Sequence, residues 1–143
     1  MTQENKVYID TSVYIAILIS LTEREKIYKL LQKTTLCSST ILLLETERNL
    51  IRLSRENRLT SEQFSTARNQ LIEETASFLL KDFTSDLTLT GEFPAILTPR
   101  SNDLIHLRTA LWFKKNGGLD SFFTLDTKQR ASARELGLKT IGL

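Results

Sequence analysis

The sequence predicts an α/β fold in which a central parallel sheet carries helices on both faces. Short runs rich in β-branched and aromatic residues alternate with longer amphipathic runs along the 143 residues. That alternation favours parallel strands, because each connection between them has room for a helix. Only five glycines and two prolines are present, which argues against disorder and against an all-β fold with many tight turns. The length suits one domain, residues 1–143.

The first half of the chain predicts two strands, each followed by two helices. β-branched and aromatic residues mark the strands, and amphipathic runs mark the helices. Thr60 or Ser61 can cap the last helix, and Glu62 or Gln63 can reach back to complete a capping box. The expected elements are strand 6–9, a helix that Asp10, Thr11 or Ser12 can cap and that runs to about residue 20, helix 22–33, strand 34–38, helix 38–57 and helix 60–83.

The second half predicts three strands with a helix before each of the last two. Residues 86–90 alternate in the manner of a strand, and residues 91–100 contain both prolines and favour a loop. The next helix has a hydroxyl start and a Lys-Asn-Gly stop. The remaining expected elements are helix 101–118, strand 121–125, helix 126–137 and strand 138–143.

The charge and the single cysteine limit the class of protein. The net charge is only +2, so any binding to phosphates would have to come from a local basic patch. Cys37 cannot form an internal disulfide, fits a reducing cytoplasm and excludes zinc sites that need two or four cysteines. The longest apolar run, residues 13–19, is far short of the roughly 20 residues that span a bilayer. We therefore expect a cytoplasmic protein without a membrane span or a targeting segment.

Two acids directly follow predicted strands. Asp10 ends "VYID", and Asp126 follows "FFTL". In an open parallel sheet both would lie at the carboxyl edge, where ligands usually bind. The alternative is that each aspartate caps the helix that begins there, which is an ordinary role for this residue.

Two further acids lie on helix faces that we expect to point inward. Asp103 shares a face with Leu107 and other apolar residues of its helix. Glu45 shares a face with Arg48, whereas Glu47 falls among the leucines. The alternatives are a first-turn acid favoured by the helix dipole for Asp103 and a weak surface ion pair with Arg48 for Glu45.

Four inward acids in one small domain would repel one another and would stay partly protonated. A hard divalent cation removes that problem, and carboxylate oxygens in octahedral geometry suit Mg²⁺ or Mn²⁺. Such an ion activates water and neutralises the transition state of phosphodiester cleavage. The acids therefore predict a metal site for hydrolysis of a phosphodiester.

Four segments resemble those of PIN-domain ribonucleases, and specifically the VapC toxin of VapBC toxin–antitoxin pairs. They are "VYIDTSVYI", "SSTILLLETERNL", "NDLIHLRTAL" and "FFTLDTKQRASARELGLKTI", which cover the start, the early middle and the last third of the chain. The resemblance implies a three-layer α/β/α fold with a central parallel sheet. It also implies a catalytic and metal-binding site at the positions that match the family's acids, which are Asp10, Glu45, Asp103 and Asp126. The family pattern of Glu, two residues and Arg favours Glu45 over Glu47 in "ETER".

The resemblance further implies cleavage of RNA with Mg²⁺ or Mn²⁺, a homodimer and inhibition by a small antitoxin protein. The chain departs from the family where a further helix often precedes the third acid, because residues 91–100 are few and contain prolines. The alternatives are a non-toxin PIN nuclease of RNA processing and a non-catalytic relative that binds RNA or protein. A HAD-type phosphatase would need a second Asp where this chain has Ser12, and no Gly-rich phosphate loop precedes a helix.

Polar side chains next to the acids have two interpretations. Thr11, Ser12 and Thr124 either cap helices or hydrogen-bond to a metal-binding carboxylate. His106, the only histidine, is expected to form a hydrogen bond near the acids without touching metal. Arg48 starts a series of arginines along its helix, which is either a solvated face or a track for the RNA backbone.

Overall fold

Five strands form one sheet in which every neighbouring pair is parallel, as the alternation of strands and helices predicts. The computed structural model describes residues 5–89, 93–98 and 100–143. The sheet order is β3-β2-β1-β4-β5, so the first strand is central, with Tyr8 paired to Cys37 on one side and to Phe122 on the other. The strands are β1 (Asn5–Ile9), β2 (Thr34–Ser39), β3 (Leu79–Lys81), β4 (Ser121–Phe123) and β5 (Thr140–Ile141).

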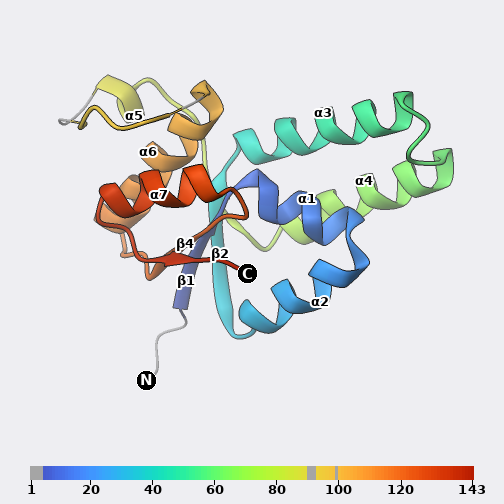
Figure 1. Ribbon diagram of the computed structural model, residues 1–143, viewed down its shortest axis with the longest axis horizontal. Coiled ribbons are helices and arrows are strands. Elements are labelled where there is room, and N and C mark those ends of the chain that lie inside the picture. The colour runs from blue at the N-terminus through green and yellow to red at the C-terminus, as the bar shows by residue number, and fades with distance from the viewer. Residues whose placement is uncertain (1–4, 90–92, 99) are drawn as a thin grey trace.

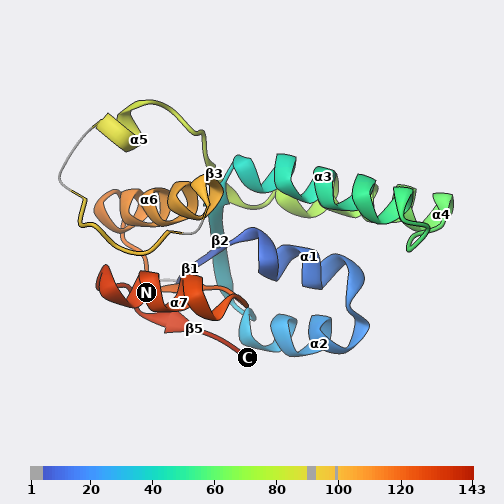
Figure 2. The ribbon, with the colours of Figure 1, turned by 45° about the horizontal axis from the view of Figure 1, so that its top comes forward.

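Helices cover both faces of this sheet, which gives three layers (Figure 1). Side chains alternate along β1, so Val7 and Ile9 join a core with the first four helices, whereas Tyr8 joins a second core with the last two. In both views α3 and α4 run side by side and extend beyond the sheet (Figure 2). The helices are α1 (Thr11–Ile19), α2 (Leu21–Leu30), α3 (Ile41–Arg55), α4 (Ser61–Thr75), α5 (Asp86–Leu89), α6 (Ser101–Lys115) and α7 (Thr127–Glu135).

The prediction of a strand at 86–90 is wrong. Residues Asp86–Leu89 form the short helix α5, in which Leu87 is buried. The edge strand is instead β3, within the segment expected to continue helix 60–83, because α4 ends at Thr75 and Leu79 then pairs with Cys37 of β2. A two-residue alternation over so few positions fits either element, and pairing with a distant strand decides between them.

Most other expected elements form with shifted ends. The β2 strand extends to Ser39, so α3 begins at Ile41 rather than at residue 38. Thr60 caps α4 in a capping box with Gln63, as its sequence predicts. The α6 helix stops at Lys115, and the two glycines that follow have positive φ angles of 101° and 90°. Residues 93–98 contain no helix or strand, as expected, while residues 90–92 and 99 lie outside the described part of the chain.

No helix within the described ranges is long and apolar enough to cross a bilayer.

Candidate active site

Asp10 lies where β1 ends, beside the end of β4. Its backbone N–H donates to the carbonyl of Phe123 at 3.3 Å, and its side chain is only 5% exposed. The hydroxyls of Ser12 and Thr124 donate to its Oδ1 and Oδ2, both at 2.5 Å. The side chain makes no capping hydrogen bond to α1, so the short bonds from these two hydroxyls hold the carboxylate.

Glu45 lies in the second turn of α3 and faces α1 and α6. Its Oε1 accepts hydrogen bonds from the Thr11 hydroxyl at 2.7 Å and from Nε2 of His106 at 2.8 Å. Its Oε2 accepts a longer bond, 3.3 Å, from the side-chain amide of Asn102. The ion pair is therefore with His106, whereas Arg48 is exposed. The surface pair expected as the alternative does not form.

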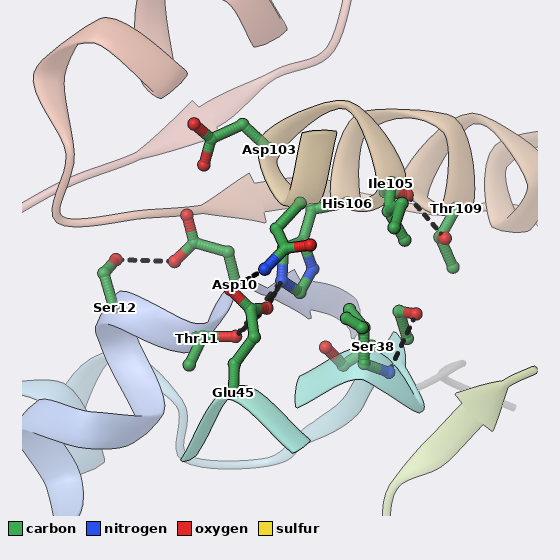
Figure 3. A network of polar contacts seen from close by, with 12 residues as sticks. Asp10, Thr11, Ser12, Ser38, Glu45, Asp103, Ile105, His106 and Thr109 are labelled. Atoms are coloured by element: carbon green, nitrogen blue, oxygen red, sulfur yellow. Dashed lines mark hydrogen bonds and ion pairs between the residues drawn. The ribbon is translucent and has the colours of Figure 1, made fainter. Parts of the chain in front are cut away.

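Asp103 is in the first turn of α6 and is half-buried. Figure 3 shows its carboxylate pointing toward the same space as that of Asp10. Its Oδ2 is buried and has no hydrogen-bond partner among the described residues. A buried carboxylate oxygen without a donor is costly unless a cation or water supplies the missing interaction.

Asp126 caps α7, as the alternative interpretation expects. Its Oδ1 accepts from the backbone N–H groups of Lys128 and Gln129 at 2.8 and 3.3 Å. Its own N–H donates to the Thr124 hydroxyl at 3.1 Å, and that hydroxyl donates to Asp10. One hydroxyl therefore connects the residues that follow two neighbouring strands.

The carboxyl groups have different electrostatic environments. Burial raises the pKa of Asp10, against the opposing effect of nearby His106. Burial also raises the pKa of Asp103, and the negative charges of Asp126 and Glu45 add to this effect while Arg100 opposes it. Burial acts to raise the pKa of Glu45, but the hydrogen bond and charge of His106 outweigh it, so that the pKa is lowered. His106 thus acts on three of these carboxyl groups, and the charge of Asp126 acts on Asp103.

The donor set suits a hydrated divalent ion. No three His, Cys, Asp or Glu side chains in the described ranges lie close enough together to enclose a metal ion. Mg²⁺, however, usually keeps several waters and is held by one or two carboxylates together with substrate phosphates. The unpartnered Oδ2 of Asp103 and the raised pKa values of two carboxyl groups fit such an ion, because a cation would relieve both.

Sequence reasoning missed two contributors to this site. The sequence indicates for Tyr8 only a place in the first strand, yet its hydroxyl contacts Nδ1 of His106 at 2.7 Å. It indicates for Asn102 only a place at a helix start, yet the Asn102 amide donates to Glu45. Its position directly before Asp103 was the one available signal. Tyr8 and His106 are 98 residues apart in sequence, so their contact left no local pattern.

Three solved structures, two of them of VapBC or VapC proteins, share this fold. VapBC2 from Rickettsia felis, solved bound to a DNA fragment from its promoter, has a TM-score of 0.61 and 14% identity over 96% of this chain and 98% of that one. Mycobacterium tuberculosis VapC20, a toxin that cleaves the sarcin-ricin loop, has a TM-score of 0.53 and 17% identity over 87% and 93%. PAE2754 from Pyrobaculum aerophilum has a TM-score of 0.54 and 15% identity over 95% and 83%. At such low identity, the structural likeness establishes a common fold and no more.

Sequence comparison with curated proteins finds no match. The family profile described as PIN domain matches residues 7–135. That span includes the four acids Asp10, Glu45, Asp103 and Asp126. Together with the parallel sheet of order β3-β2-β1-β4-β5, this match shows that the chain belongs to the PIN domain family.

Proposed function

We propose that the chain is a metal-dependent ribonuclease whose Asp10, Glu45, Asp103 and Asp126 hold Mg²⁺ or Mn²⁺. The observation that carries this proposal is the gathering of acids from separate elements around His106 in a PIN domain, with one buried carboxylate oxygen left without a partner. Acids that are buried and repel one another are unfavourable for stability alone and suit a cation site.

The chain's own side chains would position the acids for hydrolysis. Ser12 and Thr124 hold Asp10, and Thr11 holds Glu45, each through a hydroxyl that donates to the carboxylate. When bound, a divalent ion would provide an activated water and neutralise charge on the phosphodiester. Arg48 is exposed one turn beyond Glu45 on α3, and we assign it to the RNA backbone.

We further propose that the chain is the toxin of a toxin–antitoxin pair, with a small antitoxin protein as its partner. The structural likeness to VapBC2 and VapC20 supports this assignment. A homodimer and a cytoplasmic location belong to the same proposal, and the lone buried Cys37 is compatible with a reducing compartment.

Asp10→Asn tests the nuclease proposal. The change keeps the shape of the side chain and removes one charge, so folding should persist while metal affinity falls. We expect Mg²⁺-dependent cleavage of RNA by wild type, its loss in EDTA, and a rate at least about 100-fold lower for the variant, a loss of a few kcal/mol of transition-state stabilisation.

Asp120→Asn is the matched control. Asp120 precedes β4 at the opposite edge of the sheet, where it accepts from the backbone N–H of Lys6 at 2.7 Å. This variant should cut RNA at the wild-type rate. Cleavage by Asp10→Asn at the wild-type rate in the same Mg²⁺, or cleavage by wild type that EDTA does not affect, would refute the mechanism.

Toxicity is a separate question with its own measurement. Expression of wild type without any partner should arrest growth of the host, and Asp10→Asn should not. An active nuclease that leaves growth unchanged would favour a role in RNA processing.

A further inference from the structure

A buried series of hydrogen bonds leads from the second core to Glu45. Tyr8 is 0% exposed and His106 is 2% exposed. The Tyr8 hydroxyl lies 2.7 Å from Nδ1 of His106, and Nε2 of the same ring lies 2.8 Å from Oε1 of Glu45. Figure 3 shows the ring of His106 projecting from α6 toward the carboxylate of Glu45, with Thr11 on the other side of that carboxylate. These hydrogen bonds thus connect strand β1 to an acid of the proposed site.

The chemistry of these groups determines which atoms donate. An ionised carboxylate only accepts hydrogen bonds, so Nε2 of His106 must carry the proton that it shares with Glu45. Nδ1 of the same ring is within hydrogen-bond distance of the Tyr8 hydroxyl, which can donate to a neutral ring or accept from an imidazolium. The Tyr8 ring is itself held by stacking on Phe122, with centroids 5.3 Å apart and planes at 5°. A rigid strand residue therefore fixes the orientation of the histidine.

In this arrangement the two carboxylate oxygens of Glu45 have different hydrogen-bond partners and different roles. Oε1 accepts from both Thr11 and His106. Oε2 has only the 3.3 Å bond from Asn102. With Oε1 occupied by two strong donors, the carboxylate cannot rotate without breaking both bonds, and Oε2 is the oxygen that remains available to a ligand.

We infer that Tyr8 and His106 are positioning residues that hold Glu45 so that its Oε2, and not its Oε1, is presented to the cation. The inference rests on the proposed function, because it concerns the same site, but neither residue touches the ion or the RNA. If His106 served only to fill the core, its Nε2 would not need to donate a hydrogen bond to Glu45. Such outer partners of metal-binding carboxylates typically change metal affinity when they are removed.

Four variants distinguish a positioning role of Tyr8 and His106 from a role in packing alone. Tyr8→Phe removes only the hydroxyl, His106→Leu removes both ring nitrogens, and His106→Gln keeps a donor where Nε2 lies. Tyr14→Phe is the control, because Tyr14 is equally buried and its hydroxyl also donates to a carboxylate, that of Glu74 at 3.2 Å, away from the four acids.

The main measurement is the dissociation constant of Mn²⁺, by calorimetric titration of each folded protein. Tyr8→Phe and His106→Leu should bind Mn²⁺ about tenfold more weakly than wild type. His106→Gln should recover most of that loss, and Tyr14→Phe should bind as wild type does. In cleavage assays kcat should fall for the first two variants while KM for RNA stays unchanged, because neither residue contacts the substrate.

The single histidine allows a direct spectroscopic test on the metal-free protein. In a ¹⁵N-labelled sample the only imidazole signals come from His106. We expect Nε2 to be protonated, because it donates to the carboxylate of Glu45. An unprotonated Nε2 would overturn the hydrogen bond on which the positioning role rests, whatever the protein does to RNA.

The outcomes distinguish this inference from the proposed function. Mn²⁺ binding and cleavage by wild type, together with unchanged Mn²⁺ affinity in folded Tyr8→Phe and His106→Leu, would overturn the positioning role and leave the nuclease intact. A wild-type protein that neither binds Mn²⁺ nor cuts RNA would overturn both. Should His106→Leu fail to fold, the comparison of Tyr8→Phe with Tyr14→Phe still decides the matter.

Discussion

At the scale of single residues, acids of one site are held in different ways. Hydroxyls of Ser12 and Thr124 hold Asp10, whereas His106 and a threonine hold Glu45. The buried Oδ2 of Asp103 has no donor among the described residues. Because their surroundings differ, Asp103 and Glu45 should affect the stability of the metal-free protein in opposite directions, both when pH changes and when either acid is neutralised by substitution.

Replacement of Asp103 by Asn should stabilise the metal-free protein. The pKa of Asp103 is raised, chiefly by burial, so the folded state binds its proton more tightly than the unfolded chain does. Stability therefore falls as pH rises from the unfolded value of about 3.9 through the folded pKa, and the cost is complete above it. At about pH 8, urea unfolding should show Asp103→Asn to be more stable by less than about 1 kcal/mol, because the exposed part is screened. The difference should shrink toward about pH 4. A lower midpoint for the variant at the higher pH would contradict the argument.

Replacement of Glu45 by Gln should have the opposite effect. The pKa of Glu45 is lowered: burial would raise it, but the hydrogen bond and charge of His106 prevail. Its contribution to stability is present above the unfolded value of about 4.3 and is lost as pH falls through the folded pKa. Metal-free Glu45→Gln should therefore unfold at lower urea concentration than wild type at neutral pH, and the gap should narrow in acid. Equal midpoints at neutral pH would show that His106 does not stabilise the charged form.

At the scale of elements, two residues of the proposed site lie directly before the first residue of a helix. The α7 helix begins at Thr127, and Asp126 caps it while its charge acts on Asp103. By contrast, Asp10 precedes α1 and makes no side-chain cap. The position directly before a helix thus serves as a cap in one case, whereas in the other two hydroxyls donate to the carboxylate.

Variants of Asp126 can separate these two roles. Asn caps a helix as well as Asp does, so Asp126→Asn should keep the wild-type free energy of unfolding, whereas Asp126→Ala should lose about 1 kcal/mol. Both variants should bind Mn²⁺ more weakly, because both lack the charge. Chemical unfolding and Mn²⁺ titration measure the two effects independently. A Mn²⁺ affinity of Asp126→Asn equal to that of wild type would leave Asp126 as a cap alone.

At the scale of the whole molecule, the parallel sheet brings the ends of separate elements to one place. Asp10 and Asp126 follow the neighbouring strands β1 and β4, while Glu45 and Asp103 come from helices on opposite faces. Charges gathered in this way oppose folding unless a cation is present. The stability of the domain should therefore depend on metal and pH together.

Mn²⁺ should raise the melting temperature, and it should do so more at about pH 8 than at about pH 5, because protons already relieve the repulsion in acid. An ion that binds only the folded site stabilises it by about 2.7 kcal/mol at 100 times its dissociation constant. A melting series in Mn²⁺ at both pH values measures this effect, with Asp10→Asn as the control that should respond less. Equal melting temperatures with and without Mn²⁺ at the higher pH would mean that the acids do not form a cation site.

The local sequence was sufficient to predict most elements, whereas the assignment of the four acids to one site stays a prediction. Strand and helix periodicity predicted the parallel sheet, and Thr60 with Gln63 marked the start of α4. The positions of Asp10 and Asp126 directly after strands pointed to one edge of the sheet. These features depend on residues a few positions apart, so each is visible in a short window of sequence.

Only the tertiary structure decided which short segment became the edge strand and how the acids are held. Residues 79–81 pair with β2, whereas residues 86–89 form a helical turn, and neither outcome follows from local preference. The same is true of the contact between Tyr8 and His106, which are 98 residues apart in sequence. Strand pairing and buried hydrogen bonds form between distant segments, and their free energies outweigh the weak local propensities of three or four residues.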